Sequence, residues 1–227
     1  MSELIVSAAA SLTEVLTELA RQAPGMTVRR NVASSGALLQ QIRQGAPVDV
    51  LISASTRELD TLEQEHRLEK ATRVTVASNR LVLIAPQGSM LRRWEELASG
   101  LVTRVALSQP SSVPSGRYAK ETLQHRKLWK AVEPKAVYGE NVRQTLAYVA
   151  GSNVEAGLVF ATDARAEKRV CIIATAQPGL DHSPILYPAA VLTGAPNPAA
   201  ARRFVVFLQS KAAQAIFARF GFTPPGR

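Results

Sequence analysis

Serine residues stand at points where the sequence predicts that a β-strand gives way to a helix. Ser11 follows the apolar run Leu4 to Val6 and three alanines, and Ser35 follows a predicted strand over residues 26–32. A helix that begins at such a junction presents free backbone N–H groups and the positive end of its dipole, which favour a bound anion. Serine hydroxyls are further hydrogen-bond donors. These residue types indicate anion binding.

The same arrangement recurs along the chain. Small or capping residues lead into helical periodicity near Ser115, Val142 and Thr162 as well. At the first junction, Glu14 lies three residues after Ser11, which predicts a capping box with Ser11 as the N-cap. An ordinary capped helix explains any one junction alone. Five junctions in one chain favour a ligand site, because open α/β sheets bind ligands beyond the carboxyl ends of their strands.

The elements that must position these residues alternate between strand and helix. Strands are predicted at residues 4–6, 26–32, 48–52, 81–86, 104–107, 156–160 and 185–192, and a closing helix over 199–220. This order predicts an α/β fold whose strands are joined by crossover helices. The 227 residues suffice for one large domain or for two of about 100 residues each.

Composition and charge exclude some classes of protein. Hydrophobic residues make up 46% of the chain, yet no run approaches the roughly 20 apolar residues that a membrane-spanning helix needs. The net charge of +9 permits nucleic-acid binding in principle. However, the Lys and Arg residues are dispersed and form neither a basic run nor an aromatic RNA-reading motif. A solvated surface is therefore predicted.

Metal and thiol chemistry find little support. Cys171 is the single cysteine, so an intrachain disulfide and a thiolate metal cluster are excluded, and its apolar surroundings predict a buried structural residue. The three histidines, His66, His125 and His182, show no metal-ligand spacing and are predicted to lie at the surface.

Catalytic motifs are also missing from the sequence. There is no G-x-S-x-G elbow, Walker loop, G-x-G-x-x-G or H-E-x-x-H. The Ser34-Ser35-Gly36 segment is similar to a nucleophile turn, but no histidine is placed to activate it. Asp49 and Asp163 are a possible acid pair, although capping of a helix explains Asp163 as well.

Short segments occur in an order that is specific, although each one is weak alone. They are Ala8-Ala9-Ala10-Ser11-Leu12, Ala33-Ser34-Ser35, residues 45–54 (GAPVDVLISA), Val113-Pro114-Ser115-Gly116 with Tyr118-Ala119-Lys120, Asn141-Val142-Arg143, Gly157-Leu158-Val159-Phe160 and residues 217–222. With this order from residue 5 to residue 223, the chain resembles the periplasmic molybdate-binding proteins of ABC importers, the ModA family.

The resemblance implies a type II periplasmic-binding-protein fold of two α/β lobes, each a sheet flanked by helices, with a ligand cleft between them. Lobe I is expected to comprise residues 1–80 and 190–227, and lobe II residues 81–189. The two hinge crossings are expected near residues 80–85 and 183–191.

In this family, an oxyanion is held by hydrogen bonds alone. The resemblance assigns the ligand contacts to Ser11 and Ser35 through hydroxyl and backbone N–H, to Ser115 and Val142 mainly through backbone N–H, and to Phe160 at the place of a ligand-contacting tyrosine. Ser115 stands where alanine is usual, which keeps the backbone donor and adds a hydroxyl. Phe160 lacks the O–H group with which a tyrosine would donate to the ligand. Such a hydrogen bond to a charged ligand contributes about 1.5–3 kcal/mol.

The implied function is that of a non-enzymatic, soluble binding protein. It is expected to capture molybdate or tungstate and to deliver it to the membrane permease of an ABC importer, as a monomer and without a cofactor, a directly bound metal ion or a nucleic-acid partner. A periplasmic location is implied, with the signal peptide absent from this sequence because Met1-Ser2-Glu3 leads directly into the first strand.

Alternatives to this function remain open. Helix N-termini do not specify their ligand, so a receptor for another tetrahedral oxyanion such as sulfate is the first alternative. The effector domain of a transcription regulator would share the fold, but this sequence opens on a strand and a helix-turn-helix segment before it is not expected. An enzyme is the third alternative.

Overall fold

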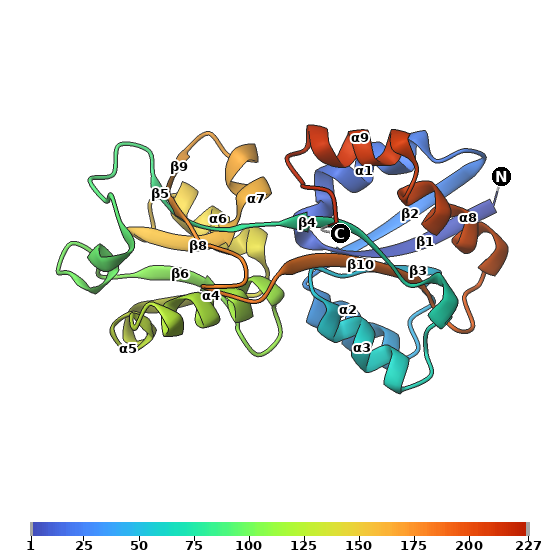
Figure 1. Ribbon diagram of the computed structural model, residues 1–227, viewed down its shortest axis with the longest axis horizontal. Coiled ribbons are helices and arrows are strands. Elements are labelled where there is room, and N and C mark those ends of the chain that lie inside the picture. The colour runs from blue at the N-terminus through green and yellow to red at the C-terminus, as the bar shows by residue number, and fades with distance from the viewer. Residues whose placement is uncertain (1, 226–227) are drawn as a thin grey trace. The chain divides into compact units, whose positions relative to one another are not determined.

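The computed structural model describes residues 2–225 of the chain, which divides into two compact units (Figure 1). Unit 1 consists of Met1–Ser78 and Leu186–Arg227, and unit 2 of Asn79–Ile185. The sequence-based boundaries lie after residues 80 and 189, and residues 1, 226 and 227 of the predicted lobe I are outside the described part. Each unit is an α/β structure, so the predicted fold class is confirmed.

Unit 1 is built on a mixed sheet with the strand order β2-β1-β3-β10-β4. Strand β1 is parallel to β2 and β3, and β10 is antiparallel to β3. Helices α1 and α9 lie over one face, and α2 and α3 over the other (Figure 1). The elements are β1 (Ser2–Ala9), α1 (Thr13–Gln22), β2 (Met26–Ala33), α2 (Ser35–Arg43), β3 (Val50–Ile52), α3 (Thr56–Gln64), β4 (Val74–Asn79), β10 (Ile185–Val191), α8 (Pro198–Leu208) and α9 (Lys211–Arg219).

Unit 2 repeats this plan with the strand order β7-β6-β8-β5-β9. Strand β6 is parallel to β7 and β8, whereas β5 is antiparallel to β8 and β9. The elements are β5 (Leu81–Pro86), β6 (Val105–Ser108), α4 (Pro114–His125), α5 (Trp129–Val132), β7 (Ala136–Gly139), α6 (Val142–Ala150), β8 (Ala156–Phe160), α7 (Ala161–Ala166) and β9 (Val170–Thr175).

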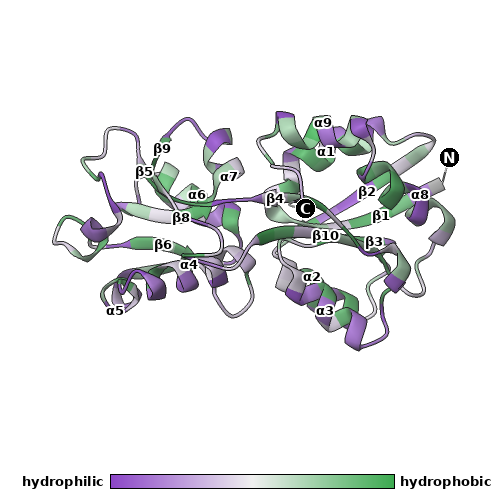
Figure 2. Cartoon of the chain, viewed as in Figure 1, coloured by the Kyte–Doolittle hydropathy of each residue, from purple (hydrophilic) through white to green (hydrophobic). Residues whose placement is uncertain are grey.

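Hydrophobic residues are frequent in the central strands of both units and also occur on the helices (Figure 2). Strands β3, β6 and β8 are buried along their whole length, as expected for strands covered on both faces. In unit 1, Leu38, Ile42, Leu59 and Leu62 from α2 and α3 pack with Leu51 of β3 in one core cluster. The exposed edge strand β2 contains the hydrophilic residues 29–31. Among residues 2–225, no helix is both long enough and apolar enough to cross a membrane.

Some local predictions differ from the structure. The single closing helix over 199–220 is wrong, because the Ser210 hydroxyl accepts a hydrogen bond from the N–H of Ala213 and begins α9 as a separate helix after α8. Strands β4, β7 and β9 were not among the predicted strands. Cys171 on the edge strand β9 is only partly buried, not fully buried as predicted.

Candidate functional site

The carboxyl ends of β1, β2 and β3 lie at one edge of the sheet of unit 1. The parallel register pairs Ala8 with Ile52 and Ala9 with Ala33. The segments that follow these strands therefore begin side by side, and they carry Ser11, Ser35 and the Ser53–Ser55 loop. Both predicted site serines of unit 1 are buried at this edge.

Ser11 does not cap a helix, so the predicted capping box is wrong. It lies in a 3-10 turn, Ala10–Leu12, that precedes α1, and no side-chain cap begins that helix. Its Oγ lies 2.9 Å from the hydroxyl oxygen of Tyr187 on β10, and either group can be the donor. The Tyr187 ring, which is fully buried, makes an edge contact with Phe222 at 5.3 Å between centroids. The Ser11 hydroxyl is thus held by a residue 176 positions away.

Ser35 is the first residue of α2, and its hydroxyl oxygen accepts a hydrogen bond. The donor is the backbone N–H of Ala54, at 3.0 Å. This bond uses an oxygen lone pair and leaves the hydroxyl proton of Ser35 to be donated elsewhere. Because the donor is a backbone group in the loop after β3, the position of Ser35 Oγ is tied to the sheet.

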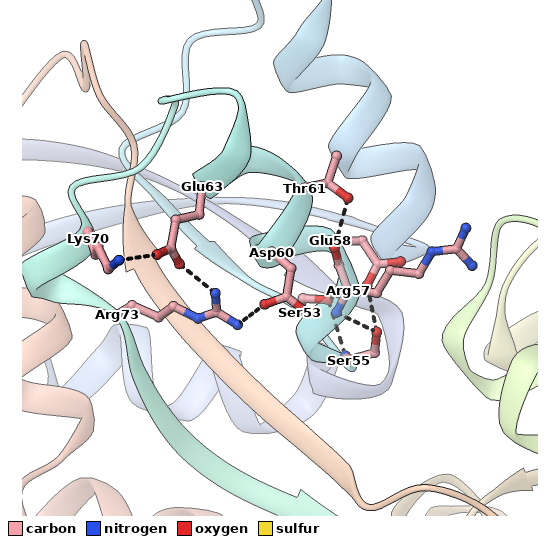
Figure 3. A network of polar contacts seen from close by, with 9 residues as sticks. All are labelled: Ser53, Ser55, Arg57, Glu58, Asp60, Thr61, Glu63, Lys70 and Arg73. Carbon is pink, nitrogen blue, oxygen red and sulfur yellow. Dashed lines mark hydrogen bonds and ion pairs between the residues drawn. The ribbon is translucent and has the colours of Figure 1, made fainter.

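The loop that carries Ala54 is fixed by a buried carboxylate (Figure 3). The hydroxyls of Ser53 and Ser55 both donate to Glu58 Oε2, at 3.1 and 2.9 Å. The Ser55 hydroxyl also accepts from the N–H of Arg57 and so caps α3. We infer that Glu58 acts on the loop geometry, since two serines on either side of Ala54 converge on it.

A group of ion pairs joins Asp60 and Glu63 of α3 to basic residues that follow the helix (Figure 3). The Arg73 guanidinium pairs with Asp60 and with Glu63, and Lys70 also pairs with Glu63 at 3.1 Å. Hydrogen bonds from Arg73 and Lys70 lower the pKa of Glu63 below its usual value. These pairs connect α3 to the segment before β4.

The site residues predicted in unit 2 lie at the carboxyl ends of parallel strands, as those of unit 1 do. The register pairs Ser108 with Gly139 and Ala106 with Gly157, so the parallel strands β6, β7 and β8 end together. Helix α4 with Ser115 follows β6, α6 with Val142 follows β7, and Phe160 ends β8. Helix α4 lies so close to the end of β6 that a Cβ at Gly116 would overlap the carbonyl oxygen of Ser108.

The first turn of α4 leaves one N–H group unused. Pro114 has no N–H, and the N–H groups of Gly116 and Arg117 donate to the carbonyl of Val113 at 3.1 and 3.2 Å. Within residues 2–225, the N–H of Ser115 has no hydrogen-bond acceptor. The resemblance predicts a ligand contact from this N–H group.

The first turn of α6 shows the same feature. The Asn141 side-chain oxygen caps this helix by accepting from the N–H groups of Arg143 and Gln144. The backbone carbonyl of Asn141 accepts from the N–H of Thr145 at 3.2 Å. The N–H of Val142 is again without an acceptor among the described residues. Two helices of unit 2 therefore present one free N–H each, at Ser115 and Val142.

Phe160 is 1% exposed and belongs to an aromatic cluster with Tyr118 and His182. Its ring centroid lies 6.3 Å from that of Tyr118, which makes an edge contact with His182 at 5.6 Å. The prediction that His182 lies at the surface is wrong, since it is 4% exposed and its Nδ1 lies 2.7 Å from the carbonyl of Ser183. The ring of Phe160 is thus an apolar wall at the end of β8.

Neither aspartate that the sequence suggested as an acid pair is available for one. Asp49 in unit 1 accepts from the backbone N–H groups of Ile5 and Asn197. Asp163 in unit 2 is fully buried and pairs with Arg143 Nε at 2.8 Å, which joins α7 to α6. Among residues 2–225, no cluster of three or more His, Cys, Asp or Glu residues is arranged to hold a metal ion.

Sequence reasoning missed the groups that hold these donors in place. Tyr187 sits in an apolar strand, and Glu58 and Arg143 look like ordinary charges on helices. Glu58 follows a Ser-Ala-Ser segment at short range, which is a local signal of a cap. The contact between Ser11 and Tyr187 has no local signal.

The chain is similar to known bacterial binding proteins over nearly its whole length. A family model described as bacterial extracellular solute-binding protein matches residues 4–223. The molybdate-binding protein ModA of Escherichia coli is 37% identical over 97% of this chain and 89% of its own length. ModA of Haemophilus influenzae is 32% identical over 98% and 90%. The solved periplasmic molybdate-binding protein of Azotobacter vinelandii has a TM-score of 0.87 and 25% identity, with 98% of this chain and 100% of that chain covered.

Proposed function

The chain belongs to the family of bacterial extracellular solute-binding proteins, and we propose that within this family it captures molybdate and tungstate for a membrane permease of the ABC type. The molybdate-binding relatives, which match this chain over nearly its whole length, support this choice of ligand. The protein acts by binding and release, as a periplasmic monomer without cofactor or enzymatic step.

The observation that carries the proposal is the set of free donors at the strand ends. Ser115 and Val142 each present an unused backbone N–H in unit 2, and Ser35 in unit 1 retains a hydroxyl proton. The hydroxyl of Ser11 joins this set when Tyr187 is the donor of their 2.9 Å hydrogen bond, which leaves the Ser11 proton for the anion. These donors are neutral, and neutral N–H and O–H groups at helix starts suit an anion that is recognised by hydrogen bonds alone.

The same donors disfavour phosphate. Phosphate near neutral pH keeps at least one proton, and burying that O–H without an acceptor costs roughly 1–3 kcal/mol. None of the five proposed contact residues, Ser11, Ser35, Ser115, Val142 and Phe160, has a carboxylate to accept it. Molybdate, tungstate and sulfate have no such proton. Sulfate, a smaller dianion, is the alternative ligand, and size is what separates it from molybdate.

A panel of oxyanions tests the proposal. The purified protein is incubated with molybdate, tungstate, sulfate or phosphate, and native mass spectrometry and thermal unfolding are recorded. A ligand at a thousand times its dissociation constant adds about 4 kcal/mol to the free energy of unfolding. We expect molybdate and tungstate to bind and to raise the melting temperature. A melting temperature unmoved by both at millimolar concentration contradicts the proposal, and a shift with sulfate alone selects the alternative.

A further inference from the structure

Four residues of unit 2 form a continuous chain of hydrogen bonds that the proposed function does not require. Ser115 Oγ lies 2.7 Å from Ser108 Oγ, and Ser108 Oγ lies 2.8 Å from Thr145 Oγ1. Thr145 Oγ1 in turn donates to the backbone carbonyl of Asn141, at 3.1 Å. The three side chains are at most 1% exposed. The chain therefore runs from the start of α4, past the end of β6, to the start of α6.

The chemistry of the last acceptor sets the direction of every bond in this chain. A carbonyl oxygen only accepts, so the Thr145 hydroxyl gives its proton to Asn141. Ser108 must then donate to Thr145, and Ser115 must donate to Ser108. The hydroxyl proton of Ser115 is consequently committed inside unit 2. Toward a bound anion, Ser115 has only its backbone N–H to donate.

The chain ends on the peptide group that contains the N–H of Val142. The carbonyl of Asn141 and this N–H belong to one planar trans peptide, so fixing the carbonyl also fixes the direction of the N–H. Hydrogen bonds accepted by a group polarise it and strengthen the bonds that it donates. The Asn141 carbonyl accepts two, from the hydroxyl and from the N–H of Thr145.

We propose that Thr145, Ser108 and the Ser115 hydroxyl are positioning residues that orient and polarise the Val142 N–H for the anion. This inference rests on the proposed function for its ligand. Close packing supports the arrangement, because a Cβ at Gly139 would lie 2.7 Å from Thr145 Oγ1, so the end of β7 is held against α6. The side chain of Ser115 contributes through this relay and not by direct contact with the anion.

The relay predicts an order of effects on molybdate affinity, measured by calorimetry. Thr145→Val removes the donor to Asn141 and should weaken binding about tenfold, equivalent to about 1.4 kcal/mol. Ser108→Ala removes the hydroxyl that donates to Thr145 but keeps the bond from Thr145 to Asn141. It should weaken binding about threefold, since cooperative strengthening is a smaller effect than the bond itself. Ser115→Ala should change affinity about twofold or less. Thr145→Ser keeps the hydroxyl and should restore wild-type affinity.

Thr122→Val is the matched control. Thr122 lies on α4, is fully buried, and its hydroxyl has no hydrogen-bond partner among the described residues. This substitution should leave the affinity for molybdate unchanged. Melting temperatures of all variants separate a loss of affinity from a loss of folding, and Ser108→Ala carries the test if Thr145→Val does not fold.

A second readout needs no ligand. The amide proton of Val142 in a ligand-free NMR spectrum should move upfield in Thr145→Val, and return in Thr145→Ser, because its peptide is less polarised. If wild-type protein binds no molybdate, the proposed function is wrong while this readout still tests the relay. If wild-type protein binds and Ser115→Ala shows the largest loss of the three, or the Val142 amide does not move in Thr145→Val, the relay is wrong.

Discussion

Serines in the two units occupy the same kind of junction but offer different groups. In unit 1, Ser35 Oγ accepts from the backbone of Ala54, which leaves its proton for a ligand. In unit 2, the hydroxyl of Ser115 donates to Ser108, which leaves only the backbone N–H. The group that a serine at a helix start can offer to a ligand therefore depends on whether a neighbour uses its hydroxyl proton or its oxygen lone pair. Its position in the helix does not decide this.

The largest expected effect comes from removing the hydroxyls of unit 1. A hydrogen bond to a charged group contributes about 1.5–3 kcal/mol, so Ser11→Ala combined with Ser35→Ala should weaken molybdate binding by at least about a hundredfold. Calorimetry on this double variant and on Ser115→Ala measures the contrast directly. Circular dichroism should show an unchanged fold. A double variant that binds within about tenfold of wild type would remove the distinction between the units.

Tyr187→Phe sharpens the assignment of Ser11. It removes the hydroxyl that lies 2.9 Å from Ser11 Oγ but keeps the ring against Phe222. Losing one such partner, about 1 kcal/mol, should weaken molybdate binding about fivefold. In a Ser11→Ala background the same substitution should have no further effect on binding, because the two residues act together. Equal losses in both backgrounds would show that Tyr187 acts through another group.

Phe160→Tyr asks whether unit 2 gains from a donating side chain. The ring lies buried at the end of β8, where the resemblance places a ligand-contacting tyrosine. A new O–H that reaches the anion should tighten molybdate binding about threefold, less than a full bond because the buried hydroxyl is desolvated without ligand. Phe160→Leu, which adds no donor, is the control. Weaker binding by Phe160→Tyr than by Phe160→Leu would exclude this contact.

The smallest effect on binding is expected from Asp181→Asn, which alters the stability of unit 2. Burial raises the pKa of Asp181, but the N–H of Gln177 and the side chains of Arg126 and His125 outweigh it, so the pKa is lowered. A carboxylate with a lowered pKa stabilises the fold at pH values above its ordinary pKa of about 3.9. This contribution is lost as the pH falls through the lowered pKa.

Urea unfolding of wild type and Asp181→Asn at a series of pH values measures this contribution. Wild type should be more stable at neutral pH, and the difference should shrink only below about pH 4. Molybdate affinity at pH 7 should be the same in both proteins. A difference in stability that grows toward acid pH would contradict the assigned role.

The sequence was sufficient for the architecture and for the family. The alternation of strand and helix predicted an α/β fold, and the order of short segments predicted the family. The fold class and the family are both confirmed. These are local signals or their order, which a sequence contains directly. The prediction of a single closing helix was wrong because Ser210 acts as an N-cap, although the helical spacing of apolar residues continues on both sides of it.

The hydrogen-bond partners of Ser11, Ser35 and Ser115 were beyond sequence reasoning for a physical reason. Ser11 and Tyr187 are 176 residues apart, and Ser35 and Ala54 meet only because β1, β2 and β3 end at one edge. The capping box at Ser11 was the reasonable local expectation, and a long-range tyrosine hydroxyl displaced it. The direction of the Ser115 bond likewise depends on Thr145 and on the Asn141 carbonyl.

A crystal structure of the protein grown with sodium molybdate tests the central claim most directly. The anomalous signal of molybdenum locates the anion independently of its oxygens. We predict molybdate oxygens within hydrogen-bond distance of the Ser11 and Ser35 hydroxyls and of the Ser115 and Val142 N–H groups, with the Ser115 hydroxyl still bonded to Ser108. No molybdenum at these four donors, or a Ser115 hydroxyl turned from Ser108 to the anion, would contradict the account.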